Sequence, residues 1–159
     1  MKRPWNIIDL PIYSLATNDS YGKLNMNICT YVSAVSMNPK MYAIAIDYKS
    51  KTFDNLENSS FVVLQILSKE NIKLVRKLGK NSGNKIDKEK YLVEKCFLQY
   101  WNSYKVLNRA SAYICLKKIS SIKNHGDHAI YLFDVLNSKT ISEDNILTFQ
   151  YLVEKKIIL

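Results

Sequence analysis

The stretch that decides the fold runs from Asn25 to Leu67 and reads NMNICTYVSAVSMNPKMYAIAIDYKSKTFDNLENSSFVVLQIL. Its pattern predicts a strand over 27–36, a turn at Pro39 and an alternating strand over 41–48. In the alternating strand the two alanines fall on one face and the two isoleucines on the other. The alanine face is small, so we expect that a flat or bulky group can approach the sheet there.

A loop rich in lysine and hydroxyl groups follows, with Lys49, Ser50, Lys51 and Thr52 standing where a helix over 52–59 begins. A helix N-terminus carries partial positive charge, so it repels lysine and attracts anions, phosphate above all. The loop therefore predicts a pocket for a negatively charged group. Taken alone, it is equally typical of a solvated turn in which Thr52 is an ordinary N-cap.

The 159 residues suit one domain spanning residues 1–159, and an apolar content of 47% predicts an ordered globular protein. The formal net charge of +9 fits nucleic acid, an anionic membrane or a small anionic ligand. Because the lysines are scattered, nucleic acid is disfavoured and a phosphorylated small molecule is favoured. No apolar run resembles a signal peptide or a membrane span, so we expect a cytoplasmic protein with no membrane partner.

The cysteines and histidines form no metal-binding pattern, so we expect no metal site. The three cysteines are Cys29, Cys96 and Cys115. They are far apart and odd in number, which favours free thiols in a reducing compartment over a disulfide framework. The segment Gly126-Asp127-His128 fits a surface turn, or a strand start from which His128 donates to a ligand or titrates.

The remaining segments are mainly strands, with helices inserted between them and one at the end. We expect strands over 12–17, 61–67, 109–123 and 128–136, a turn at Asn137-Ser138, and helices over 69–78 and 143–153, capped by Ser68 and Ser142, with Gly79 ending the first. Residues 80–90 have loop composition, and 91–108 give no interpretable pattern. The order predicts a mainly β fold, an antiparallel β-barrel with peripheral helices.

In this order, the segments resemble the flavin reductase-like family, whose fold is the FMN-binding split barrel. Residues 30–39 resemble the strand that lines the isoalloxazine ring, and 48–67 resemble the phosphate loop and the strand after it. Two pieces within 82–88, Ser-Gly and Asp-Lys, resemble the family's "SG…DK" loop. Residues 126–128 resemble its G-D-H element near the flavin and the nicotinamide. The match covers about 25–139.

The resemblance implies an antiparallel split β-barrel that forms a homodimer and holds a flavin, FMN rather than FAD, near the subunit interface. The residues implied to line the flavin ring are Thr30, Tyr31, Val32, Ser33 and Ala34. Those implied to hold the phosphate are Lys49, Ser50, Lys51 and Thr52, with Ser82, Gly83 and Lys88 over the ribityl or phosphate end. NAD(P)H is the implied hydride donor, and His128 the implied orienting residue for the nicotinamide or the flavin edge.

The implied activity is that of an NAD(P)H-dependent flavin oxidoreductase, with a partner monooxygenase or another electron acceptor. The sequence distinguishes neither NADH from NADPH nor a bound flavin cofactor from a diffusing flavin substrate. Two other functions stay open. One is a flavin-binding electron carrier or store without reductase activity. The other is a basic nucleic-acid-binding barrel, which the net charge and the 11 tyrosines favour.

Overall fold

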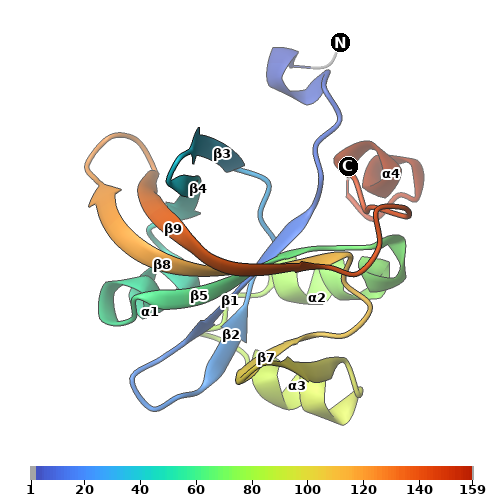
Figure 1. Cartoon of the computed structure of the whole chain (residues 1–159). Coiled ribbons are helices and arrows are strands. Elements are labelled where there is room, and N and C mark those ends of the chain that lie inside the picture. Colours follow the sequence, from blue (N-terminus) through green and yellow to red (C-terminus); the bar gives the residue numbers. More distant parts are fainter. Residues whose placement is uncertain (1–2, 159) are drawn as a thin grey trace.

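The computed structural model describes residues 3–158, and within them one antiparallel sheet dominates (Figure 1). Its strands are β1 (Tyr13–Asn18), β2 (Leu24–Met26), β3 (Val32–Met37), β4 (Lys40–Asp47), β5 (Phe61–Ile66), β8 (Ala112–Ile122) and β9 (His128–Thr140), in the order β2-β1-β5-β8-β9-β4-β3. A separate hairpin pairs β6 (Leu98–Trp101) with β7 (Tyr104–Leu107).

Short helices connect and cover the strands. They are α1 (Lys51–Asn58), α2 (Ile72–Lys80), α3 (Lys88–Glu94) and α4 (Phe149–Glu154), with 3-10 turns at Pro4–Asn6 and Lys69–Asn71. Side-chain caps begin three of these helices: Ser50 accepts from the Phe53 amide, Asp87 from Lys90 and Thr148 from Tyr151. None of the helices in residues 3–158 has the length and apolar character needed to cross a membrane.

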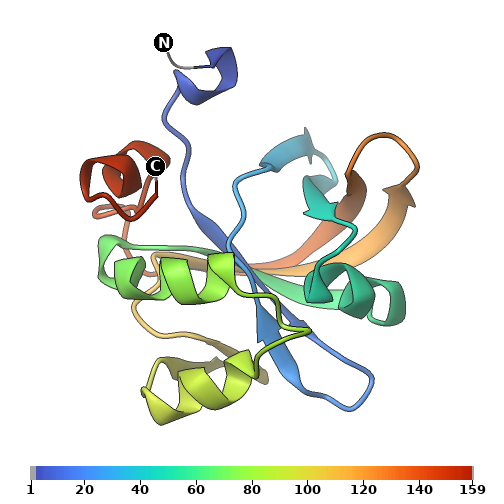
Figure 2. The same cartoon turned by 180° about the vertical axis from the view of Figure 1, so that it is seen from behind.

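Strand β5 and the first half of β8, up to Leu116, are buried on both faces, because their alternate residues enter two different cores. Val63 and Tyr113 pack with residues of α2, α3 and α4. Leu64 and Ile114 pack in the second core with Leu56 of α1 and with β4 and β9. The continuous apolar run of 61–67 thus behaves as predicted for a strand covered on both sides. Figure 2 shows α2 lying across one face of the sheet.

The mainly β class with peripheral helices is confirmed, whereas a closed barrel is not. Within residues 3–158 no ladder joins the edge strands β2 and β3. One isolated bridge, Tyr13 to Cys29, connects β1 to the segment before β3. That segment therefore runs beside β1, but within the described residues it forms no continuous ladder that would close the sheet into a barrel.

Several predicted boundaries are corrected. Strand β3 begins only at Val32, α1 begins at Lys51 with Ser50 as its cap, and α2 continues past Gly79 to Lys80. Strand β9 extends to Thr140, so the predicted turn at 137–138 is wrong. The helix predicted over 143–153 is only 149–154, and its cap is Thr148 rather than Ser142. Four features went unpredicted: the 3-10 turn at Pro4–Asn6, strand β2, helix α3, which starts inside the expected loop, and the β6–β7 hairpin within 91–108.

Candidate functional site

A cavity of about 560 Å³ opens beside the N-terminus of α1. Six parts of the chain line it: the segment around 25–31, the end of β4 at 45–47, the loop and first turn of α1 at 49–52, the end of α2 and the following loop at 78–83, and the single residues Lys88 and His128. The antiparallel pairing of β4 with β9 sets Asp47 opposite His128, which brings two of these parts together.

The first turn of α1 makes one end of the cavity cationic. Lys51 and Lys88 line this end together, whereas Lys49 lies near Asp127 and Lys80 lies on the wall formed by the end of α2. The amides of Lys51 and Thr52 open the helix, where backbone N–H groups lack intrahelical acceptors. The helix dipole adds partial positive charge at the same place. This end therefore favours an anion.

The Ser50 hydroxyl forms hydrogen bonds with backbone groups, although the residue lines the cavity. Its Oγ donates to the carbonyl of Asp47 at 2.7 Å and accepts the Phe53 amide at 3.1 Å. The Ser50 hydroxyl proton is already used in the hydrogen bond to Asp47, which leaves the lysines, the free amides and the Thr52 hydroxyl as the anion donors. Asp47 also accepts the Lys49 amide at 2.8 Å, so the loop is held in place by its own polar groups.

Lys88 enters the cavity wall as a buried cation. Only 5% of the residue is exposed, and its Nζ donates to the carbonyls of Met26 at 2.9 Å and Leu78 at 2.7 Å. The Leu78 carbonyl belongs to the last turn of α2, where carbonyls lack helical partners. An ammonium has three donors, so one remains beyond these two bonds. Burial lowers the pKa of Lys88 to about 8.

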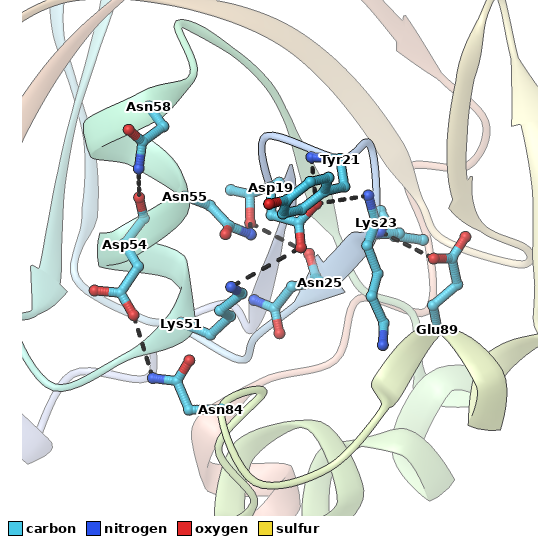
Figure 3. A network of polar contacts seen from close by, with 12 residues as sticks. Asp19, Tyr21, Lys23, Asn25, Lys51, Asp54, Asn55, Asn58, Asn84 and Glu89 are labelled. Atoms are coloured by element: carbon cyan, nitrogen blue, oxygen red, sulfur yellow. Dashed lines mark hydrogen bonds and ion pairs between the residues drawn. The ribbon is translucent and has the colours of Figure 1, made fainter.

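A buried polar network supports the floor of the cavity. Asn25 donates its amide to Thr52 Oγ1 at 3.2 Å, and Asn55 of α1 donates to Thr17 Oγ1 at 3.0 Å. Thr17 donates in turn to the carbonyl of Asn25 at 3.4 Å. These contacts tie α1 to β1 and β2, and Figure 3 shows Asn25 and Asn55 among the side chains of this network. Thr52 is only 1% exposed, so it reaches the cavity from within this network.

The loop after α2 closes on Asn25. A Cβ at Gly83 would overlap Asn25 Oδ1 and would lie 3.0 Å from the Cβ of Lys51. Residue 83 must therefore lack a side chain for the loop to approach this closely. The Oδ1 atom of Asn25 is buried and has no hydrogen-bond partner within the described chain. An unpaired buried oxygen beside the cavity is costly unless a ligand or water reaches it.

Another part of the cavity lining carries aromatic and imidazole groups. Nδ1 of His128 lies 2.6 Å from Oδ1 of Asp127, and this hydrogen bond holds the pKa of Asp127 below its ordinary value. Because a carboxylate accepts, Nδ1 carries the proton and Nε2 is the ring nitrogen left for a ligand. The Tyr31 ring meets the His128 ring edge-on, with centroids 5.4 Å apart. Ala45 contributes a small side chain to the adjoining wall.

Most of the predicted site residues meet in this cavity. The residues that line it are Thr30, Tyr31, Lys49, Ser50, Lys51, Thr52, Ser82, Gly83, Lys88 and His128. The other three lie outside the lining: Val32 packs against the second core, and Ser33 and Ala34 are exposed on β3. In the described chain, no group of three or more His, Cys, Asp or Glu residues could hold a metal ion.

Sequence reasoning missed the wall that precedes β3. Asn25 and Asn27 line the cavity, and Asn27 Oδ1 also accepts the Leu15 amide at 2.9 Å in place of a backbone carbonyl. Their spacing in an otherwise apolar segment was the available signal. Cys29 lines the same wall, and burial raises the pKa of its thiol to about 12. Such a thiol stays neutral and acts as an apolar wall group.

The sequence profile of the flavin reductase like domain matches residues 6–152. Because the match spans most of the chain, the protein belongs to this family, as the resemblance in its sequence indicated.

Solved structures share the fold. An FMN-binding protein from Thermus thermophilus with bound p-hydroxybenzaldehyde is 16% identical, with a TM-score of 0.77 over 94% of this chain and 86% of that chain. The flavin reductase PheA2 is 19% identical, with a TM-score of 0.73 over 94% of both chains. A Streptomyces globisporus NADH:FAD oxidoreductase in complex with NAD and FAD fragments is 14% identical, with a TM-score of 0.76 over 89% and 81%. A comparison with curated protein sequences finds no match.

Proposed function

We propose that the protein binds FMN in the cavity beside α1 and catalyses hydride transfer from NAD(P)H to it. The observation that carries the proposal is the polarity of this one cavity. Lys51, Lys88 and the α1 N-terminus lie together in one part of it, and the lining also includes the small side chain of Ala45 and the rings of Tyr31 and His128. A ligand with a phosphate at one end and a flat heterocycle at the other matches this arrangement.

The residues present fit such a ligand in detail. Lys49, Lys51 and the first amides of α1 supply charge-assisted donors for a phosphate, and Lys88 keeps one donor beyond its two carbonyl bonds. Asn25 lines the same cavity, and its buried Oδ1 has no hydrogen-bond partner within the described chain. The loop at Gly83 leaves no side chain to obstruct this end.

When bound, the flavin supplies the ring chemistry that accepts a hydride and passes electrons on. The protein's part is to bind and orient. The small side chain of Ala45 leaves room for a ring to lie against β4. Tyr31 and His128, whose rings contact each other, line the same cavity. His128 presents Nε2 there, with Asp127 fixing the tautomer. Hydride transfer needs face-to-face positioning more than an acid or a base, so this set of residues suffices.

An apolar face next to the cavity supports a homodimer. Ile130 of β9 is cross-strand partner to Ala45 of β4 and to Ile122 of β8, so the three side chains share one face. Ile122 and Ile130 are 50% and 40% exposed, while Ala45 also lines the cavity. Exposed apolar surface of this kind marks interaction sites. A second copy of the chain on this face would border the flavin.

The test is fluorescence titration of the purified protein with FMN, followed by anaerobic mixing with NADH and with NADPH. We expect FMN fluorescence to be quenched on binding and the flavin absorbance to bleach with at least one of the two nucleotides. Binding without bleaching by either nucleotide identifies an electron carrier or a flavin store instead. Absence of FMN binding overturns the proposal, and a salt-dependent shift with single-stranded DNA would then support the nucleic-acid alternative.

A further inference from the structure

Asp19 places a fixed negative charge beside the cationic end of the cavity. It lies in the turn between β1 and β2, where its Oδ1 accepts the amides of Tyr21 and Lys23, both at 2.9 Å (Figure 3). The Lys23 amide contributes most to holding the pKa of Asp19 below its ordinary value. Since two backbone donors hold one oxygen, the carboxylate cannot swing away from the turn without losing both bonds.

The other oxygen of this carboxylate faces Lys51. Asp19 Oδ2 lies 4.0 Å from Lys51 Nζ, and the two side chains are 17% and 28% exposed. Lys51 lines the large cavity and also a smaller one of about 150 Å³, which Asp19 lines too. The Lys51 ammonium thus lies between the proposed phosphate site and a carboxylate. At 4.0 Å this pair is loose, so an incoming phosphate can compete for the ammonium.

We propose that Asp19 is a specificity-determining residue that competes with the ligand phosphate for Lys51 and so keeps the flavin exchangeable. This inference rests on the proposed function. A phosphate held by Lys51 would lie within about 8 Å of the Asp19 carboxylate, a distance over which charges in physiological salt still interact. The carboxylate neutralises part of the attraction between Lys51 and the phosphate. The phosphate therefore adds less affinity than the lysines alone would provide.

The test compares FMN with riboflavin, which lacks only the phosphate. The variant Asp19→Asn removes the charge and keeps an oxygen that can accept the Tyr21 and Lys23 amides. Asp87→Asn is the matched control, because Asp87 is also an acidic residue paired to a lysine, with its Oδ2 2.8 Å from Lys23 Nζ. Asparagine preserves its cap on α3. Asp87 lines neither cavity, so the control removes the same charge from outside the site.

At low ionic strength we expect Asp19→Asn to tighten FMN binding about 2- to 5-fold, as expected for a partly screened charge pair. Riboflavin affinity should stay unchanged, and Asp87→Asn should change FMN affinity less than about twofold. The gain should shrink in 0.5 M NaCl and vanish in a Lys51→Met background. If Asp19→Asn lowers the thermal midpoint, Asp19→Ser, which keeps a hydroxyl acceptor, is measured in its place.

Equal tightening by Asp19→Asn and Asp87→Asn overturns the inference, since net charge alone would then explain the effect. The inference is also overturned if Asp19→Asn still tightens FMN binding in the Lys51→Met background, or if it tightens riboflavin binding as well. A wild-type protein that binds neither flavin contradicts the proposed function itself. A wild-type protein that binds FMN more tightly than riboflavin, with no response to Asp19→Asn, contradicts only the role of Asp19.

Discussion

Gly83 packs against Asn25 so closely that residue 83 has no room for a Cβ. The contact joins the loop after α2 to the strand β2, two segments that are far apart in the sequence. Asn25 in turn holds Thr52 at the start of α1 through a 3.2 Å hydrogen bond. The relative positions of the loop after α2, strand β2 and the start of α1 therefore depend on the absence of a side chain at Gly83.

We expect Gly83→Ala to lower the free energy of unfolding by about 1–3 kcal/mol, because the added methyl group overpacks a site bounded by Asn25 and Lys51. FMN affinity should fall as the loop is displaced. Denaturant unfolding and FMN titration measure the two effects. The control is Gly79→Ala, whose Cβ would meet Ile28 at 3.4 Å and whose helical position gains up to ~1 kcal/mol. Wild-type stability in Gly83→Ala would contradict the packing argument.

We expect substitution of Lys51 to affect mainly FMN binding and substitution of Thr52 to affect mainly the stability of the fold. Lys51→Ala should weaken FMN binding by about 1.5–3 kcal/mol, the range for a hydrogen bond to a charged group, and leave riboflavin binding and stability near wild type. Thr52→Ala removes the acceptor of the buried Asn25 amide, so it should cost about 1–3 kcal/mol of stability. Lys85→Ala, an exposed lysine in the loop before α3, is the control. If Lys51→Ala leaves FMN affinity unchanged, the phosphate assignment fails.

FMN affinity should decrease as the pH rises through about 8. Burial lowers the pKa of Lys88 from 10.5 to about 8, so the folded protein loses this positive charge above that pH. An unfolded lysine keeps its proton up to the higher value, so the contribution of Lys88 to stability increases between pH 8 and 10.5. FMN and riboflavin titrations from pH 7 to 9.5 should show several-fold weakening for FMN alone. In Lys88→Met this weakening should disappear, and its persistence would assign the titration to another group.

His128 should affect turnover more than flavin binding. Its ring lies at the rim, and its Nδ1 is held by Asp127 at 2.6 Å. We expect His128→Ala to slow flavin reduction by NAD(P)H about tenfold, equivalent to ~1.4 kcal/mol of activation free energy, while the Kd for FMN stays within about twofold. Stopped-flow absorbance measures the first and titration the second. His125→Ala, in the same turn but outside the cavity lining, is the control. Loss of FMN binding with normal turnover would place His128 against the flavin instead.

A charge on the apolar face should dissociate the proposed dimer. Ile130→Lys places an ammonium between Ala45 and Ile122, where a second copy would otherwise cover the surface. We expect a monomer by sedimentation equilibrium and weaker FMN binding. Val93→Lys adds the same charge at another exposed apolar residue, on α3, and should leave the assembly unchanged. A wild-type protein that sediments as a monomer would contradict the dimer.

Local patterns predicted the central strands and the cationic start of α1 because their causes are local. The apolar run of β5 is continuous because that strand is buried on both faces. The pattern in β4 alternates because only one of its faces is buried. The β6–β7 hairpin was not predictable in this way, because it is placed by packing against β5 and α3. Residues 143–148 were predicted as helix, yet Leu147 instead exchanges backbone hydrogen bonds with Ile12 and Leu67. Tertiary hydrogen bonds there outweighed the local preference for helix.

The sequence by itself determined that a lysine-rich loop begins a helix beside a strand of small residues, and therefore that an anion is favoured there. Only the tertiary structure decided which groups remain free to bind one. Ser50 is committed to the backbone, Thr52 is held by Asn25 from 27 residues away, and Lys88 reaches Met26 across 62 residues. Hydrogen-bond partners so distant along the chain are fixed by the packing of α1, α2 and the sheet. Propensity and periodicity act over a few residues and carry no information about them.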